Sequence, residues 1–295
     1  MLRAALARAA IFLGAVLVLA AVYAGYKALG RALDDPWRTW PFVGGWLPRT
    51  DDLTLPPLAA ILGSFSQPVQ RNSDEVLAAM ILRSAAFTLR EAAAGFFAGL
   101  VIGLAMAVAL LRSRLLERAF LPYIIASQTV PLVAIAPIVV IWGRGNLDWL
   151  PFAWADWMSV AAIATYLTFF PVVVNGLRGL QSPEPAEVEL LESYAASRLQ
   201  VLRRLRFPAA LPYLFPALRI AATASVVGAI VGEISAGVRG GLGRLILDFA
   251  SRYTTGPERL YASIAGAALL GLVAVGAVAA VERGVLGPRA GEADE

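Results

Sequence analysis

Polar side chains inside long apolar runs are the residues of this sequence that could do chemistry. Each such group costs roughly a few kcal/mol in a bilayer unless it faces protein or water, so each is a candidate site. Glu233 is the sharpest candidate, because it is a lone carboxylate in a run of small and apolar residues. It could face a path through the membrane, or it could be an interfacial carboxylate or the structural partner of an arginine such as Arg239.

Other polar or helix-breaking residues could line the same path. They are Gln128, Thr129, Pro131, Tyr166, Thr168 and Asn175. Tyr166 and Asn175 are equally well explained as hydrogen bonds between helices. Pro131 and Pro137 break helical hydrogen bonding, which a membrane tolerates only where protein or a water-filled cavity satisfies the freed carbonyls. We therefore expect this segment to face a path or a packed interface.

The residue types that are missing exclude several kinds of chemistry. The sequence has no cysteine and no histidine, which excludes disulfides, thiolate or imidazole metal sites and catalysis by either residue. Glycines 237, 240, 241 and 243 are a weak signal for a phosphate loop, and no Gly-Lys-Ser/Thr element accompanies them. They fit a turn before an amphipathic helix from Leu245 to Tyr253. We expect no catalytic residue, metal, cofactor or nucleic-acid partner.

Composition sets the class of protein that must position these residues. Hydrophobic residues make up 59% of the 295 residues, and apolar runs of about 20 residues recur, the length that crosses a bilayer. This predicts an all-α polytopic membrane protein. The six predicted spans are Ala9 to Tyr26, Ala92 to Leu111, Tyr123 to Trp142, Trp157 to Val174, Phe215 to Ile234 and Leu260 to Ala280.

The first span could be mistaken for a signal peptide, since Arg3 and Arg8 precede its apolar core. That core is too long and lacks a clean cleavage site, so we interpret it as a membrane helix. The predicted organisation is a first helix over residues 1–30, an extracytoplasmic segment over 31–91, a transmembrane core over 92–281 and a cytoplasmic tail over 282–295.

The extracytoplasmic segment has two recognisable parts. Its tryptophans and prolines suit the headgroup region of a membrane: Trp37, Trp40, Pro41, Trp46 and Pro48. Residues Asp74 to Arg90 then predict an amphipathic helix that leads into the second span.

A charged insert at about residues 182–212 separates the fourth and fifth spans. Ser182, Pro183 and Glu184 favour a helix start, and Ser197 with Gln200 has the capping-box spacing that starts a second helix. An apolar stripe runs along the insert at Val188, Leu191, Ala195, Leu199 and Leu202. Pro208 and Pro212 are expected to end it. The sequence therefore predicts an amphipathic helical hairpin.

The spacing within this insert is more specific than its composition. Glu189 is followed after six residues by Ala195, after ten more by Leu205, and then by Phe207 and Pro208. This pattern resembles the EAA loop of the membrane subunits of ATP-binding-cassette importers. Ala195 stands where that family usually has glycine, and two leucines stand where it usually has alanines, so the bend is expected to be less sharp.

Two further blocks carry the resemblance over nearly all of the chain beyond residue 55. Residues Ser127 to Asn146 and Ala217 to Gly243 are similar to segments of the sulfonate, nitrate, taurine, thiamine-precursor and riboflavin branch of these permeases. The resemblance implies the type I importer permease fold. It also implies that the hairpin docks on an ATPase subunit through Glu189, Leu191, Tyr194, Ala195, Arg198 and Leu199. Without the resemblance, the hairpin could simply lie on anionic lipid through its arginines.

The implied function is uptake of a small organic solute through the bilayer, driven by ATP hydrolysis on a separate subunit. An aminopyrimidine thiamine precursor or riboflavin is favoured, with sulfonate, taurine or nitrate next. Implied partners are ATPase subunits, an extracytoplasmic solute-binding protein and a second permease copy. A small-residue face on the fifth span suits that copy: Ala222, Ala224, Gly228, Ala229 and Gly232.

Two other functions remain open from the residues alone. An ion-coupled secondary transporter would show inverted repeats and more buried ionisable groups. A membrane scaffold without transport would not support ATP hydrolysis by partner subunits in response to a solute-binding protein.

Arginine placement predicts the orientation in a prokaryotic inner membrane. The loop after the second span carries Arg112, Arg114 and Arg118, and the hairpin is richer still, whereas the loop after the third span carries only Arg144. Both termini and the hairpin should face the cytoplasm. The loop before the last span, with Arg239, Arg244, Arg252 and Arg259, is a mild signal against this.

This orientation can be tested with single cysteines, because the chain has none of its own. A cysteine at Ser193 should react with an impermeant thiol reagent only from the cytoplasmic side, and one at Thr255 only from outside. The measurement is labelling in intact cells against inverted vesicles. The reverse pattern would refute the orientation.

Overall fold

The computed structural model of the chain describes residues 2–34, 50–69, 74–145 and 153–287. Regular structure in these ranges is helical, apart from one isolated antiparallel bridge between Pro68 and Val76. The predicted all-α class is therefore confirmed. The chain forms two compact units, one of residues 1–81 with 246–265 and one of residues 82–245 with 266–295.

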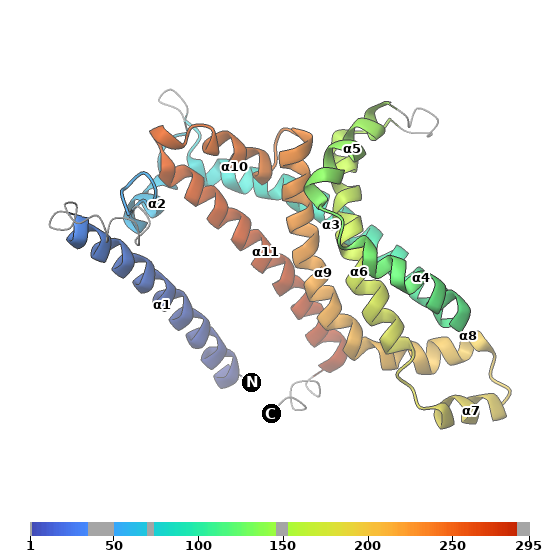
Figure 1. Ribbon diagram of the computed structural model, residues 1–295. Helices are drawn as coiled ribbons and strands as arrows, with labels where there is room; N and C mark the ends of the chain where they lie inside the picture. Colours follow the sequence, from blue (N-terminus) through green and yellow to red (C-terminus); the bar gives the residue numbers. More distant parts are fainter. Residues whose placement is uncertain (1, 35–49, 70–73, 146–152, 288–295) are drawn as a thin grey trace. The chain divides into compact units, whose positions relative to one another are not determined.

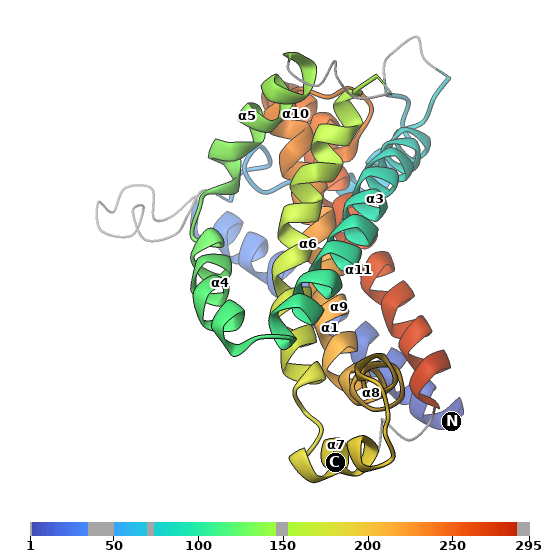
Figure 2. The same ribbon diagram turned by 90° about the vertical axis from the view of Figure 1, so that its right-hand side faces the viewer.

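Five helices in the described part of the chain are long and apolar enough to cross a membrane. They are α1 (Leu2–Asp34), α3 (Leu77–Leu111), α6 (Asp156–Leu180), a stretch that ends with α9 (Phe207–Ala236), and α11 (Pro257–Leu286). The third of the six predicted spans is instead a pair of shorter helices, α4 (Arg114–Ser127) and α5 (Leu132–Gly145), bent by 98° (Figures 1 and 2).

The bend in the third predicted span has a local cause. Pro131 has no N–H to continue the helix, and the N–H groups of Gln128, Thr129 and Val130 bond to carbonyls three residues back. The predicted straight crossing from Tyr123 to Trp142 is therefore replaced by a helix, a tight turn and a second helix.

Other boundaries move for similar reasons. The predicted amphipathic segment at 74–90 and the second span form one continuous helix, α3, because no proline or glycine breaks the chain between them. Pro57 stands before the short α2 (Leu58–Ser64), and α10 spans Leu242–Ala250, three residues earlier than predicted. The aromatic stretch predicted at Trp37 to Pro48 lies outside the described residues.

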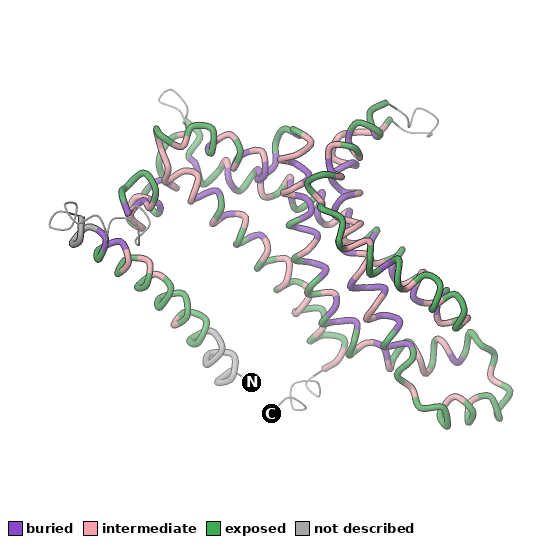
Figure 3. Tube along the Cα trace, in the orientation of Figure 1, coloured by how far each residue is buried: buried purple, intermediate pink, exposed green. Residues whose placement is uncertain are grey.

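Helix α6 is the centre of the larger unit, and half of the residues in its most apolar stretch are buried (Figure 3). On one side it meets three glycines of α3 spaced four residues apart. A Cβ atom on Gly95 would lie 2.4 Å from the Cβ of Ala164, and one on Gly99 would lie 2.6 Å from the Cβ of Thr168. Gly103 meets Val172 in the same way. This repeated small-xxx-small pattern lets the two backbones approach closely.

On its other side α6 packs along α9 (Figures 1 and 2). Gly228 approaches the backbone of Ala164, and Gly232 contacts Val160 and Ile163. The small-residue face predicted on the fifth span is thus used at least partly within the chain. Ala164 lies between a glycine of α3 and a glycine of α9, which leaves no room for a larger side chain there.

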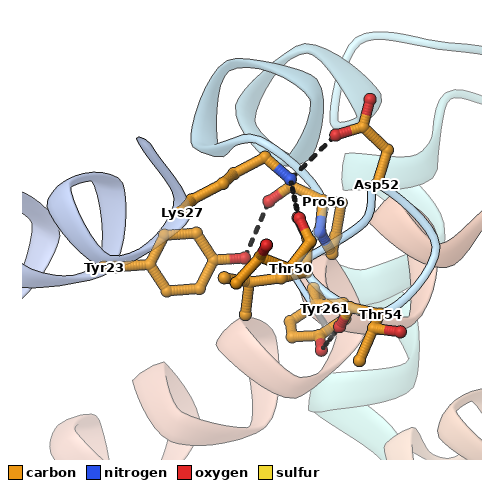
Figure 4. Close-up of polar contacts among 8 residues, drawn as sticks. Tyr23, Lys27, Thr50, Asp52, Thr54, Pro56 and Tyr261 are labelled. Atoms are coloured by element: carbon orange, nitrogen blue, oxygen red, sulfur yellow. Dashed lines mark hydrogen bonds and ion pairs between the residues drawn. The ribbon is translucent and has the colours of Figure 1, made fainter. Parts of the chain in front are cut away.

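The smaller unit is organised around Lys27, the only lysine in the sequence. Its buried ammonium group forms an ion pair of 2.8 Å with Asp52 and donates to the carbonyls of Thr50 and Leu55 (Figure 4). These partners offset the cost of burying the charge.

Two tyrosines bind the same turn, residues 50–56, from different helices. Tyr23 of α1 donates to the carbonyl of Pro56, and Tyr261 of α11 donates to that of Thr54, each at 2.7 Å (Figure 4). Gly30 also packs directly against Thr50. The turn therefore ties α1 to the first turns of α11.

The close contact of α3 and α6 generates a stability prediction. Gly99→Ala should lower the free energy of unfolding by about 1–3 kcal/mol, because the new methyl group would overlap Thr168 and the carbonyl of Thr165. Gly271→Ala on α11 is the matched control: it meets nothing within 4 Å and should be neutral or stabilising by up to about 1 kcal/mol. The measurement is the thermal unfolding midpoint of each variant, and equal midpoints would contradict the packing.

Candidate functional site

The predicted hairpin between the fourth and fifth spans is present and projects beyond the ends of α6 and α9 (Figure 1). Its first helix, α7, spans Pro185–Ser193 and begins later than predicted, with Glu184 at the N-cap. The N–H of Glu184 donates to the Glu187 carboxylate at 3.0 Å, which is why the helix starts there rather than at Ser182. The second helix, α8, spans Arg198–Val201 and has the predicted capping box: the N–H of Ser197 donates to Gln200 Oε1 at 2.7 Å.

The bend between α7 and α8 lies at Ala195. Its φ of 55° is the left-handed conformation and the only positive φ of a non-glycine residue in the described ranges. An alanine pays roughly 1–2 kcal/mol for this conformation, whereas glycine adopts it freely. The backbone thus keeps a glycine-like bend, and the expectation of a less sharp bend at this residue finds no support in its geometry.

The hairpin continues into the fifth span without a break. A π-helical turn, Leu202–Arg206, follows α8, and the N–H of Phe207 bonds to the carbonyl of Leu202, five residues back. Pro208 and Pro212 do not interrupt the helix: the π-helical turn lies directly before Pro208, and Pro212 is accommodated inside α9.

Two contacts hold the hairpin to the rest of the larger unit. The guanidinium of Arg206 donates to the carbonyl of Leu180, the last residue of α6, at 2.8 Å. A cation is favourable at that negative helix end. Gln181 donates to the Glu117 carboxylate on α4 at 3.0 Å. The hairpin is therefore anchored at its base, while its tip is exposed.

The predicted coupling residues gather at that tip. Tyr194 is 78% exposed and Leu199 is 53% exposed, which is unusual for large apolar side chains outside lipid. Leu191 and Tyr194 line a hollow of about 300 Å³ between the two helices. Glu189 differs: it lines a larger groove of about 720 Å³ between α7 and α4. Arg198 is exposed at the start of α8.

Four predicted pathway residues come together at the break between α4 and α5. The hydroxyl of Tyr166, on α6, donates to the carbonyl of Ser127 at the end of α4. Gln128 follows directly, and its side-chain nitrogen is buried without a hydrogen-bond partner among the described residues. Thr129 and Pro131 are exposed in the turn. This break is a polar, non-helical point of the kind that is stable only against protein or a water-filled cavity.

The two remaining polar candidates on α6, Thr168 and Asn175, lie apart from the break. Asn175 donates to the carbonyl of Pro171 in its own helix at 2.9 Å, so the predicted bond between helices is found for Tyr166 and not for Asn175. Tyr166 and Asn175 are about 13 Å apart along the helix axis. Thr168 is fully buried against Gly99.

Glu233 belongs to a different, fully buried network at the far end of α9. Its carboxylate accepts 2.6 Å hydrogen bonds from the Thr88 hydroxyl on α3 and from the N–H of Gly243 on α10. The Thr88 oxygen in turn accepts from the N–H of Leu242 at 2.8 Å. Neither Gly241 nor Gly243 has room for a Cβ beside this carboxylate. Glu233 therefore caps the N-terminus of α10, and no ion pair with Arg239 is found.

Sequence reasoning missed Glu91, which is also fully buried and lies one helical turn after Thr88. It fell between the predicted amphipathic segment, which ended at Arg90, and the predicted span, which began at Ala92. The available signal was a carboxylate directly before Ala92 and the Gly95, Gly99, Gly103 repeat.

The comparisons with known proteins match this architecture. The family described as the binding-protein-dependent transport system inner membrane component matches residues 99–287. The chain belongs to this family. It is therefore a multi-pass inner-membrane permease of the ATP-binding-cassette class, in which permeases act with ATPase and solute-binding partners.

Two relatives and one solved structure illustrate the match. The formylaminopyrimidine transport permease protein ThiX of Halalkalibacterium halodurans is 34% identical over 66% of this chain and 73% of its own length. The riboflavin transport system permease protein RibX of Chloroflexus aurantiacus is 36% identical over 45% and 46%. The crystal structure of an amino acid ABC transporter with histidines aligns with a TM-score of 0.53 at 18% identity, covering 70% of this chain and 94% of that chain. This last match supports the permease fold.

The bend of the hairpin generates a second stability prediction. Ala195→Gly should stabilise the hairpin by about 0.5–1 kcal/mol, because it relieves the left-handed strain at some cost in unfolded-state entropy. Ala196→Gly, one residue on and without positive φ, should destabilise it by a similar amount.

The measurement is the rate of tryptic cleavage at the hairpin arginines, which reports local opening. Cleavage should slow in Ala195→Gly and accelerate in Ala196→Gly. A slower rate in both variants, or in neither, would show that the bend is not strained at Ala195.

Proposed function

We propose that this permease imports a small organic solute, with an aminopyrimidine thiamine precursor or riboflavin favoured and sulfonate, taurine or nitrate next. The relatives named for formylaminopyrimidine and riboflavin transport support this ranking. The break between α4 and α5 is the proposed contact point, with Gln128 and Tyr166 offering polar groups beside apolar helix surface. Asn175 remains a pathway candidate farther along α6. Glu233 is a weaker pathway candidate, because its carboxylate already accepts hydrogen bonds from Thr88 and from the N–H of Gly243 on α10.

The observation that carries the proposed coupling is the exposed apolar tip of the hairpin. Tyr194 and Leu199 lie in water in the isolated chain, beside a hollow lined by Leu191. Burying them in a groove of an ATPase subunit would remove apolar surface from water and is favourable. Glu189 and Arg198 are the proposed rim, and ATP hydrolysis takes place on that partner. A hairpin lying on lipid remains the competing account.

A second copy of the chain is the proposed partner within the membrane. Gly228 and Gly232 are taken by α6 of the same chain and do not serve that contact. The exposed apolar surface of α5, including Val133, Ile138 and Ile141, is available to a partner or to lipid. The proposed orientation places both termini and the hairpin in the cytoplasm.

An ion-coupled secondary transporter is the second candidate function. The observation that favours it is the pair of buried carboxyl groups, Glu91 and Glu233. The two mechanisms differ in energy source: uptake in proteoliposomes should require internal ATP and survive a protonophore if ATP hydrolysis drives it.

The coupling proposal predicts the effect of one charge at the hairpin bend. Ala195→Asp should lower uptake more than about tenfold, because an ATPase groove would desolvate the carboxylate at a cost above about 1.4 kcal/mol. Asp tolerates the left-handed conformation, so the bend itself should persist. Ala186→Asp, an exposed position in the first turn of α7, is the matched control and should transport normally.

The measurement is uptake of labelled formylaminopyrimidine, riboflavin and taurine by the complex assembled with its ATPase and binding-protein subunits. Normal uptake by Ala195→Asp would contradict the proposal that the hairpin tip docks on the ATPase subunit. Uptake of taurine alone would overturn the substrate ranking and leave the coupling proposal intact.

A further inference from the structure

Glu91 is the most isolated ionisable group in the described part of the chain. It is fully buried in α3, and both of its carboxyl oxygens lack a hydrogen-bond partner there. An ionised carboxylate with neither a counter-charge nor a hydrogen bond is too costly to keep in an apolar interior. The group therefore needs a ligand that neutralises it.

Glu233 is its neighbour. Thr88, one turn before Glu91 on the same face of α3, donates its hydroxyl to Glu233 at 2.6 Å. Glu91 therefore lies on the face of α3 that meets the Glu233 carboxylate. The two groups thus converge from α3 and α9.

The surroundings supply positive charge to one of the two only. Glu233 accepts from the N–H of Gly243 at the N-terminus of α10, where the helix dipole favours an anion. From α6 the facing groups are apolar, Val160 and Ile163 beside Gly232. Arg90, the next cation along α3, is exposed, and its guanidinium lies 4.3 Å above the Trp157 ring. Glu233 thus accepts two hydrogen bonds, whereas Glu91 has no donor among the described residues.

We propose that Glu91 and Glu233 form a binding site for one proton, which Glu91 carries and donates to the Glu233 carboxylate. The proton comes from bulk water and returns to it, so no other reactant is needed. Its loss would leave two adjacent carboxylates. The two carboxylates would repel each other and move apart. Either Glu233 leaves the N–H groups of α10, or Glu91 turns toward water, and both movements open the junction of α3, α9 and α10.

Stability linkage gives the sign of the effect. The stabilisation from the bound proton is fully present below the pH at which an unfolded glutamate releases its own, and it is lost between that pH and the pH at which the folded pair releases its proton.

The first test is an infrared titration of the full chain in lipid. At neutral pH the spectrum should contain the carbonyl band of a protonated carboxyl group, and this band should disappear at alkaline pH. Glu91→Gln should abolish it, whereas Asp74→Asn, an exposed carboxylate, should leave it unchanged. A spectrum without such a band at neutral pH, or a band that survives Glu91→Gln, overturns the proposal.

The second test follows the junction itself with a cysteine in place of Val238, which is 4% exposed between α9 and α10. Labelling by a thiol reagent should accelerate severalfold at the pH where the band disappears. The control is the same cysteine in the Glu91→Gln variant, whose glutamine cannot ionise. Its labelling reports only the pH dependence of the thiol itself and should show no such step. An identical step in both backgrounds overturns the link to α10.

If Glu91→Gln does not assemble, the chain that carries only the cysteine at Val238 still tests the proposal, through its infrared band and its labelling rate. Coincident loss of the band and opening of the junction support the site. A band that persists while the junction opens contradicts it.

Discussion

Close backbone contact along α6 is the constraint on which the larger unit depends. Lipid tails are as apolar as leucine side chains, so helices in a bilayer are held by packing and hydrogen bonds rather than by exclusion of water. Ala164 shows how tight this packing is, with Gly95 of α3 on one side and Gly228 of α9 on the other. Any larger residue at these crossings would push the helices apart, so the positions of α3 and α9 follow from their glycines.

The two polar sites of this unit lie toward opposite ends of one helical stretch. Residues Arg198–Ala236 form 39 continuous helical residues, about 58 Å in length, with the hairpin at one end and Glu233 near the other. The π-helical turn and the prolines at 208, 212 and 216 lie in the half near the hairpin. Gly228 and Gly232 clamp the other half on α6. Bending is therefore easiest next to the hairpin, and the clamped half moves with α6.

The sequence predicts what depends on composition and on local capping. Apolar runs located the spans, and Ser197 with Gln200 located the start of α8, because both signals act over a few residues. The bent α4–α5 pair could not be predicted, since Pro137 lies inside a helix while Pro131 stands at a break; packing against Tyr166 accompanies the difference. The role of Glu233 also depended on Thr88 and Gly243, which are far from it in sequence or hidden in a glycine-rich turn.

Two buried ionisable residues in separate units show how this chain manages charge away from water. Three oxygen atoms surround the Lys27 ammonium group, one of them from the Asp52 carboxylate. Glu91 has no hydrogen-bond donor within the described ranges, and Thr88, one turn away, is bound to another carboxylate, that of Glu233. Because a buried charge is retained only when it is paired and hydrogen-bonded, the two residues are suited to different roles. Lys27 fits a permanent structural ion pair, whereas Glu91 fits a group that is neutral when bound to a proton and therefore responds to pH.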